Sequence, residues 1–232
     1  MKILVACEES QAVTIELRKL GHEAYSCDII ECSGGHPEWH IMQDVVPLLN
    51  REDDGNNGWH YIYFRTMDGK LHSVEEWDMI IAFPPCTYMS NAGACRMFPK
   101  KGQIEPDRFS KAMEAKAFFM EFYNADCERV CIENPVPLSV VKLPENTQII
   151  QPYQFGHPYT KKTYLWLKGL PNLNPTNIVK PVGPYVCGNT EIWKKQAANG
   201  IVYGKEKSAK YRSKTFPGIA KAMAEQWAGE CV

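Results

Sequence analysis

The spacing of apolar residues near the start of the chain predicts a strand, a helix and a second strand. Lys2–Ala6 is a short, mostly apolar run bounded by polar residues, and Glu23–Asp28 is a second β-prone run. Between them, residues 10–20 carry apolar side chains at helical spacing, and this segment stops at Gly21. Two strands joined by a helix are typical of a βαβ unit, so the sequence predicts a parallel sheet.

Later segments continue the same pattern to the end of the chain. The final helix is amphipathic, because Ile219, Met223 and Trp227 recur at four-residue intervals. Further strands are predicted at residues 41–45, 79–83, 129–133 and Thr163–Lys168, and helices at residues 109–123 and 217–228. The expected fold class is therefore α/β, with a mostly parallel sheet.

Two stretches depart from this pattern. In residues 50–77, the turn signal Asp68-Gly69 separates two β-prone stretches, residues 59–65 and Leu71–Val74. We therefore predict an antiparallel hairpin inserted in the α/β domain. Residues 87–108 lack a clear period, and a loop of that length inside a compact domain is commonly functional or disordered.

The composition is that of an ordinary globular protein, with 44% apolar and 23% charged residues. The nine cysteines include no Cys-x-x-Cys pair, so reduced thiols in a cytoplasmic protein explain them more simply than disulfides or zinc. No run approaches the ~20 apolar residues that a membrane span requires. The net charge of -1 argues against non-specific coating of nucleic acid. Residues 194–214 are locally basic, however, and could contact phosphates or form a solvated loop.

Polar residues follow three of the predicted strands. Asp28, Cys86 and Glu133 stand at their carboxyl ends, which is the edge where open parallel sheets bind ligands. A cysteine there can act as a thiolate nucleophile, and a neighbouring carboxyl group can hold or donate a proton. An acid at the end of the second strand can bind the hydroxyls of a ribose. This combination suits attack on a pyrimidine beside an adenosine-bearing cofactor.

The motifs around these residues, in their order along the chain, resemble those of the cytosine-C5 DNA methyltransferase family. Pro84-Pro85-Cys86 matches its Pro-Pro-Cys nucleophile motif, and Glu133-Asn134-Pro135 matches its Glu-Asn-Val. Ser90 and Gly93 match the Ser-x-x-Gly pattern downstream of the nucleophile. The resemblance is greatest to small phage-type members with a reduced target-recognition region.

The resemblance implies a Rossmann-like fold that binds S-adenosylmethionine. Asp28 matches the acid that holds the ribose hydroxyls, and Asp44 matches the acid near the adenine amine. Residues 3–12 stand where the family has Phe-x-Gly-x-Gly, although this chain has no glycine there. The expected cofactor-binding residues are Ala6, Cys7, Asp28, Asp44, Pro84 and Thr215.

The resemblance also implies covalent catalysis by Cys86, Glu133 and Lys162. Cys86 would add to C6 of cytosine, and Glu133 would hydrogen-bond N3 and the exocyclic amine. Lys162 would take the place of the arginine that contacts O2. C5 would accept the methyl group, and loss of its proton would expel Cys86.

DNA is the partner that the resemblance implies, with the target base flipped out of a duplex. The expected DNA-binding residues are Ser90, Arg96, Lys161, Lys194, Lys195, Lys210 and Arg212. The loop 87–108 could close over the flipped base or could be a disordered surface loop. The hairpin aromatics Trp59, Tyr61 and Tyr63 could contact DNA or pack on the main domain.

The resemblance predicts a catalytic methyltransferase domain made of residues 1–168 and 211–232. Residues 50–77 would be an inserted hairpin and residues 169–210 a reduced target-recognition region. The expected location is the cytoplasm of a bacterium or a phage-infected cell, without membrane contact. Two alternatives remain: methylation of a free pyrimidine nucleotide or single-stranded DNA, and a non-catalytic nucleic-acid-binding or regulatory protein that keeps the fold.

Overall fold

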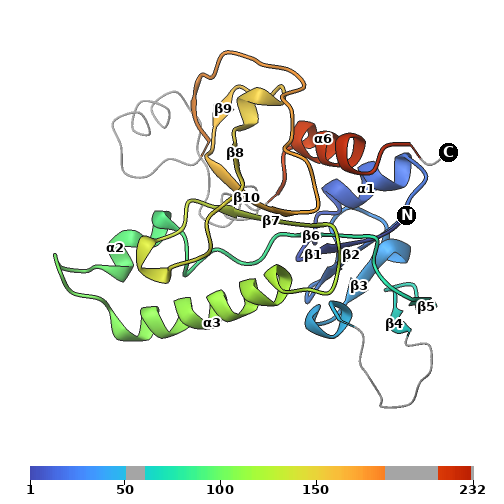
Figure 1. The fold of residues 1–232 in the computed structure, drawn as a ribbon, viewed down its shortest axis with the longest axis horizontal. Helices are drawn as coiled ribbons and strands as arrows, with labels where there is room; N and C mark the ends of the chain where they lie inside the picture. The colour runs from blue at the N-terminus through green and yellow to red at the C-terminus, as the bar shows by residue number, and fades with distance from the viewer. Residues whose placement is uncertain (51–60, 186–213, 231–232) are drawn as a thin grey trace.

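A computed structural model describes residues 1–50, 61–185 and 214–230, and its centre is a β-sheet (Figure 1). Within the described residues the sheet has seven strands, in the order β3-β2-β1-β6-β7-β10-β8. Their bounds are β1 Lys2–Ala6, β2 Glu23–Asp28, β3 His40–Met42, β6 Met79–Ala82, β7 Val130–Pro135, β8 Gln148–Ile150 and β10 Thr163–Lys168.

The sheet is mostly parallel, with one reversed strand near an edge. Strands β3, β2, β1, β6 and β7 pair parallel to one another. Strand β10 pairs antiparallel with both β7 and β8. A parallel sheet with one reversed strand inserted beside its last strand is characteristic of the Rossmann-like methyltransferase fold. The predicted fold class is confirmed.

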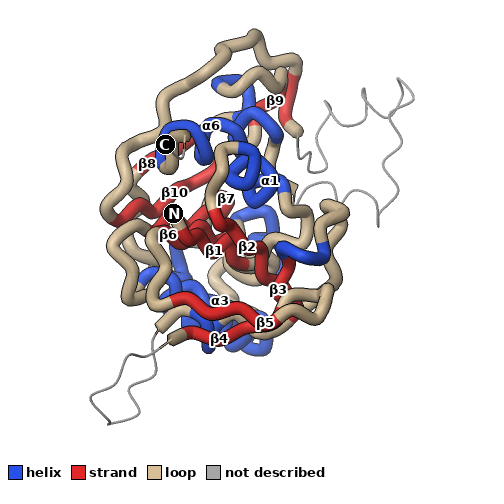
Figure 2. Tube along the Cα trace, turned by 90° about the vertical axis from the view of Figure 1, so that its right-hand side faces the viewer, coloured by secondary structure: helices blue, strands red, loops and turns tan. Residues whose placement is uncertain are grey.

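Helices cover both faces of the sheet (Figures 1 and 2). Helices α1 (Ala12–Lys19) and α6 (Pro217–Trp227) pack on one face, against the side chains of Ile3, Val5 and Ile81. Helix α3 (Pro106–Tyr123) belongs to the core on the other face, with alternate residues of the same strands. Burial on both faces explains why the central strands are continuous apolar runs.

The segment predicted as a long loop is largely folded. Residues 87–108 contain the short helices η3 (Asn91–Gly93) and α2 (Ala94–Met97), and they bury Met89 and Met97 completely. Helix α3 begins at Pro106, three residues before the predicted start. The side chain of Glu105 caps it by accepting a hydrogen bond from Arg108 N at 2.6 Å. The alternative of a disordered surface loop is therefore wrong for this segment.

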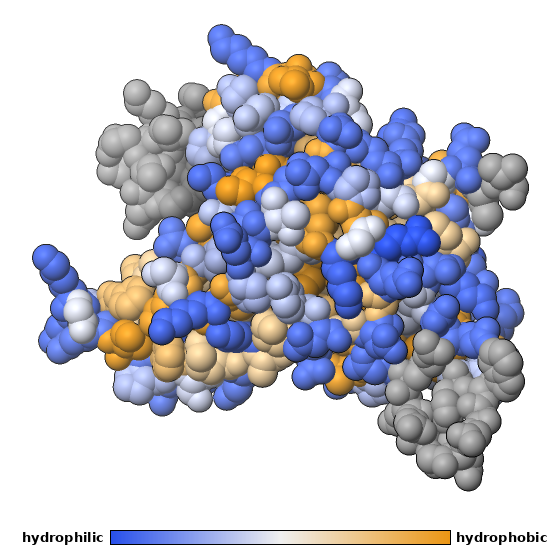
Figure 3. Space-filling model, viewed as in Figure 1, coloured by the Kyte–Doolittle hydropathy of each residue, from blue (hydrophilic) through white to orange (hydrophobic). Residues whose placement is uncertain are grey.

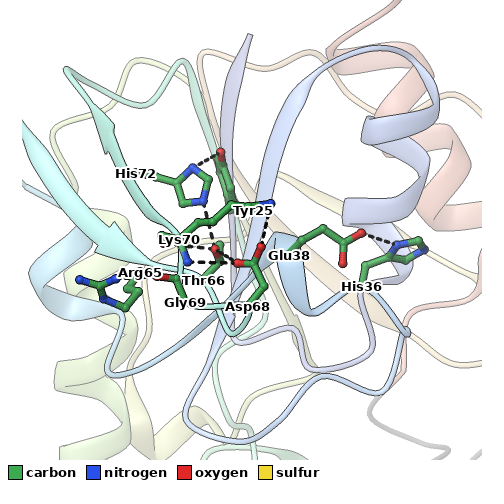
Figure 4. A network of polar contacts seen from close by, with 9 residues as sticks. All are labelled: Tyr25, His36, Glu38, Arg65, Thr66, Asp68, Gly69, Lys70 and His72. Carbon is green, nitrogen blue, oxygen red and sulfur yellow. Dashed lines mark hydrogen bonds and ion pairs between the residues drawn. The ribbon is translucent and has the colours of Figure 1, made fainter.

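Strands β4 (Ile62–Arg65) and β5 (Leu71–Val74) form the predicted antiparallel hairpin. His72 attaches the hairpin to the sheet, because its Nδ1 lies 3.0 Å from the hydroxyl of Tyr25 in β2 (Figure 4). Within the hairpin, His72 Nε2 lies 3.0 Å from Thr66 Oγ1. The ring of Phe64 packs edge-on against Tyr25. The face of the hairpin that carries Phe64 therefore packs on the domain, and Tyr61 and Tyr63 lie on the opposite face.

Tyr61 and Tyr63, two of the three hairpin aromatics singled out above, are exposed on the outer face of the hairpin. Trp59, the third, lies outside the described residues. The inner face packs against Trp77, which precedes β6, so the hairpin lies toward the amino end of that strand. Cys86 follows the carboxyl end of β6, and the hairpin is therefore not adjacent to it.

Several short elements differ from the predictions. Strand β3 is His40–Met42 rather than residues 41–45, and strands β8, β9 (Tyr159–Thr160) and β11 (Gly183–Pro184) were not predicted. These strands have two or three residues each, too few for a clear alternation of apolar and polar positions. The remaining elements are the 3-10 helices η1 Pro37–Trp39, η2 Val46–Leu48, η4 Ser139–Val141 and η5 Pro152–Gln154. Among the described helices, none has the length and apolar character needed to cross a membrane.

The packing of α3 on the sheet gives a stability prediction. Phe119 is fully buried and meets Trp166 of β10 edge-on, with ring centroids 5.0 Å apart. We expect Phe119→Ala to lower the free energy of unfolding by roughly 3–5 kcal/mol, because it removes apolar contacts and leaves a cavity. Urea denaturation measures this change, with the exposed Leu71→Ala as a control. If Phe119→Ala and Leu71→Ala lowered the free energy of unfolding equally, the packing assigned to Phe119 would be contradicted.

Candidate active site

The Cys86 loop follows directly from the end of β6. Pro84 is buried, and the chain turns so that the carbonyl oxygen of Cys86 accepts hydrogen bonds from Met89 N at 3.1 Å and Ser90 N at 2.9 Å. Two consecutive prolines end the strand, because proline has no N–H group to continue the ladder. The Cys86 side chain is half-buried at the carboxyl edge of the sheet, as the sequence predicts for a residue in this position.

Hydrogen bonds join this loop to the segment that follows β7. Asn134 Nδ2 donates to the carbonyl oxygen of Pro84 at 3.0 Å, Asn91 N donates to Val136 O at 2.8 Å, and Leu138 N donates to Met89 O at 2.7 Å. Asn134 is fully buried. Cys86 and Glu133 are therefore held at the same edge of the sheet by contacts from neighbouring residues.

Glu133 lies beside the start of β10, because that strand runs antiparallel to β7 and pairs Leu165 with Glu133. Burial raises the pKa of the Glu133 carboxyl, while the Lys161 charge and a hydrogen bond from Thr163 act in the opposite direction. A small pocket opens here, lined by Glu133, Lys161, Thr163, Lys214, Thr215, Phe216 and Ile219. The site thus combines a half-buried carboxyl group with lysine side chains.

Lys161, rather than Lys162, lines this pocket with Glu133, and Lys162 is exposed. Successive residues of an extended segment point to opposite sides, so Lys161 lies on the same side as Thr163, which is buried. The Lys161 backbone N–H is also fixed, because it donates to Gln151 Oε1 at 2.9 Å. The alternation of residues 161–163 was available in the sequence and could have distinguished the two lysines.

The loop between β1 and α1 forms without glycine. Cys7 has a φ of 58° and Gln11 a φ of 56°, both in the left-handed region that favours glycine. Gln11 is fully buried, and its Nε2 donates to His36 O at 2.8 Å and to Ser26 Oγ at 3.2 Å. These bonds offset the strain. Sequence reasoning had assigned no role to Gln11, because nothing in the local pattern marks it.

Glu8 fills the amino end of α1. Its carboxylate accepts hydrogen bonds from Val13 N at 2.7 Å, Thr14 N at 3.2 Å and Thr14 Oγ1 at 2.8 Å. The amide groups that open a helix commonly bind an anionic ligand, but here two of them are satisfied internally. Burial raises the pKa of Glu8 to about 7, although its hydrogen bonds lower it.

Two acids gather near Cys7 at the neighbouring strand ends. Burial, followed by the charge of Asp28, raises the pKa of Cys27 to about 12. The pKa of Cys7 is also raised, first by burial and then by Asp28, with Asp44 contributing. Because β2 and β3 pair in parallel, with Asp28 beside Met42, Asp28 at the end of β2 and Asp44 just after β3 lie at the same edge of the sheet. Burial raises the pKa of the Asp28 carboxyl itself.

This acidic group fits the adenosine part of S-adenosylmethionine. Asp28 is half-buried at the carboxyl end of β2, where a carboxylate can accept hydrogen bonds from ribose hydroxyls. Asp44 is exposed in the turn after β3, where it could accept from an amine. The fit is different at the methionine part, because Glu8 already occupies the first amide groups of α1.

The other predicted residues fall in several places. Ala6 is fully buried in β1 and Ser90 is only 6% exposed, so contact of either residue with a ligand or with DNA would require the surrounding segments to move. Arg96 is exposed on α2, and Thr215 lines the pocket beside Glu133. The remaining predicted DNA contacts, Lys194, Lys195, Lys210 and Arg212, lie outside the described residues.

No family model matches this sequence, and no curated protein matches it. Among solved structures, one similar chain is an Escherichia coli protein, encoded within a prophage, that has been assigned as a DNA modification methyltransferase. The two share 14% sequence identity with a TM-score of 0.41, over 82% of this chain and 55% of that chain. This chain thus spans about half the length of the other. A likeness this low carries no functional conclusion.

The environment of Glu8 predicts a pH dependence of stability. Its pKa rises from 4.5 to about 7 on burial, so the folded protein binds a proton that the unfolded chain releases between these values. The resulting stabilisation is fully present below pH 4.5 and is lost as the pH rises through about 7. Wild-type protein should therefore lose stability relative to Glu8→Gln across this interval, as measured by urea denaturation at several pH values.

A Glu9→Gln variant serves as the matched control, because Glu9 is the next residue in the loop but is not fully buried. The interpretation fails if the difference between wild type and Glu8→Gln is the same at pH 5 and pH 8, or if Glu9→Gln reproduces it.

Proposed function

We propose that this protein transfers a methyl group from S-adenosylmethionine to C5 of cytosine in DNA, through a covalent bond between Cys86 and C6. The observation that carries the proposal is that Cys86 follows β6 and Glu133 lies on the neighbouring strand β7, where Glu133 shares a pocket with Lys161. Asp28 ends β2 and Asp44 follows β3 at the same carboxyl edge of the sheet. Three kinds of group that covalent attack on a pyrimidine requires thus lie along one edge of the sheet: a thiol, a carboxyl group of raised pKa and a cation.

Glu133 is suited to assist the addition of Cys86. When the thiolate forms a bond to C6, the electrons of the C5–C6 double bond move through the ring toward N3. A carboxyl group of raised pKa is more often protonated at a given pH, and it can donate that proton to N3. The ring then becomes an enamine that is nucleophilic at C5. After methylation, loss of the C5 proton to a base reforms the C5–C6 double bond and expels the Cys86 thiolate, and the N3 proton returns to the Glu133 carboxylate.

Lys161 takes the role at O2 that the sequence had given to Lys162. It lines the pocket with Glu133, whereas Lys162 is exposed. Negative charge also develops on O2 during the addition, and an ammonium group in a partly buried site stabilises it. The same charge limits the rise in the pKa of Glu133.

S-adenosylmethionine would supply an electrophilic methyl group on a positively charged sulfur. Asp28 would bind the ribose hydroxyls and Asp44 the adenine amine, with the backbone of Ala6 and Cys7 and the ring of Pro84 around them. Thr215 would contribute from the opposite side of the pocket. The proposed catalytic domain is made of residues 1–168 and 211–232, with residues 169–210 as the reduced target-recognition region.

The covalent step gives a direct test on 5-fluorocytosine oligonucleotides. Fluorine cannot leave C5 as a proton does, so wild-type protein with S-adenosylmethionine should remain bound to the oligonucleotide in a denaturing gel. Cys86→Ala should form no adduct. Cys95→Ala, which removes an exposed cysteine of α2, should still form it. An adduct with Cys86→Ala would disprove the assignment of the nucleophile.

The same assay separates the alternative substrates. Duplex DNA, single-stranded DNA and the free nucleotide, each carrying 5-fluorocytosine, can be compared at equal concentration by mass spectrometry of the intact protein. Failure of all three, with calorimetry showing no binding of S-adenosylmethionine, would favour the non-catalytic alternative.

The two adjacent lysines give a second test. We expect Lys161→Met to slow adduct formation by roughly 10²-fold or more, because one stabilising contact to the developing charge is lost. Lys162→Met should change the rate by less than roughly threefold, as an exposed substitution. Single-turnover rates with a saturating 5-fluorocytosine oligonucleotide measure both. The opposite order would return the O2 contact to Lys162.

A further inference from the structure

Four aromatic side chains gather next to the catalytic pocket, and the proposed chemistry uses none of them. They are His157, Tyr159, Tyr185 and Phe216, and all are partly buried. The ring centroids lie 4.7 Å apart for Tyr185 and Phe216, 5.4 Å for Tyr159 and Tyr185, and 5.0 Å for His157 and Phe216. Phe216 also lines the pocket with Glu133 and Lys161. The cluster therefore adjoins the site at which the target cytosine is proposed to react.

The cluster is fixed by backbone contacts rather than by the packing of a deep core. Strands β9 and β11 pair in parallel, and Tyr185 N donates to Thr160 O at 2.9 Å. His157 Nε2 accepts a hydrogen bond from Gly218 N at 2.9 Å, which ties the start of α6 to the same segment. Burial lowers the pKa of His157, so the neutral form needed to accept this bond is favoured.

The rings do not stack face to face on one another. The planes of Tyr159 and Tyr185 meet at 60°, and those of Tyr185 and Phe216 at 66°. Edge-on contacts of this kind hold an aromatic group in place without covering both faces of each ring. Such a group beside a reactive pocket is suited to stack an unpaired base.

The surrounding segment has the charge that a nucleic acid requires. Residues 146–190 contain four lysines and no aspartate or glutamate. Lys161 belongs to this acid-free segment and lines the pocket with Lys214. In Figure 3, hydrophobic residues reach the surface between the upper part of the molecule, which holds β8 and β9, and the lower part, which holds α3. Aromatic rings combined with positive charge are typical of surfaces that bind single-stranded nucleic acid.

We propose that Tyr159, Tyr185 and Phe216 form a stacking site for an unpaired DNA base that flanks the target cytosine. This inference rests on the proposed function, because it takes DNA as the substrate. It also predicts the conformation of the bound DNA, in which at least one base next to the target is unstacked from its neighbours. Phosphates beside it are attracted by Lys162, which is exposed and is not used in the proposed chemistry.

A binding measurement with wild-type protein tests the stacking directly. The probes are two fluorescently labelled 12-nucleotide strands without cytosine: oligothymidine, and the same strand with abasic sites at every second position. Both carry the same phosphates, so a stacking site predicts tighter binding of oligothymidine in fluorescence anisotropy. Equal affinity for the two strands would overturn the proposal without any variant being needed.

Variants then locate the site. Tyr159→Leu should weaken binding of oligothymidine by roughly 5- to 150-fold while leaving the abasic strand little affected, because one base loses its aromatic partner. Tyr159→Phe keeps the ring and should bind as wild type does. Tyr123→Leu, which removes an exposed ring of α3, is the matched control. Unchanged affinity in a folded Tyr159→Leu protein would also overturn the proposal.

The result of the oligothymidine binding experiment does not depend on the result of the trapping experiment that tests the proposed function. Oligothymidine contains no cytosine, so its binding does not depend on Cys86. Ring-dependent binding together with failed trapping on 5-fluorocytosine would retain the stacking site and reject the chemistry. Successful trapping together with ring-independent binding would do the reverse.

Discussion

The pairing of β6 with β7 is the constraint on which the candidate site depends. It brings the carboxyl ends of both strands to one edge, and Asn134 then fixes the turn by donating to the carbonyl oxygen of Pro84. The Asn134 side chain is fully buried and its Oδ1 has no hydrogen-bond partner among the described residues, so loss of the Nδ2 bond would leave the amide unpaired at a further cost of about 1–3 kcal/mol. Cys86 and Glu133 are therefore positioned by the sheet itself rather than by a flexible loop.

The loop between β1 and α1 reaches the same edge of the sheet, and it forms without glycine. Two residues other than glycine adopt left-handed conformations, and Gln11 stabilises the loop from inside through bonds to Ser26 and His36. Glu8 satisfies amide groups at the start of α1 that a ligand would otherwise meet. Any cofactor bound here would interact mainly with the acids at the ends of β2 and β3. This arrangement is better suited to binding the adenosine portion of a cofactor than to binding an anionic group at the amino end of α1.

The reversed strand β10 supplies the rest of the site. Because it runs antiparallel to β7, its first residues lie beside the last residues of β7, and Lys161 meets Glu133. Phe216, which directly precedes α6, lines the same pocket. Basic and aromatic groups that are far apart along the chain thus surround one carboxyl group. The proposed chemistry and the proposed stacking site share this origin.

The local pattern of apolar and polar residues predicts the α/β class and the bounds of β1, β2, β5 and β10, because apolar runs and hairpin turns act locally. It also identified Cys86, Glu133 and Asp28 as residues at strand ends. The folded structure was needed to show that Lys161 rather than Lys162 shares a pocket with Glu133, that Gln11 and Glu8 build the first loop, and that Tyr159 meets Phe216. These relations depend on contacts between distant segments, and the direction in which a side chain points there is set by packing rather than by local sequence.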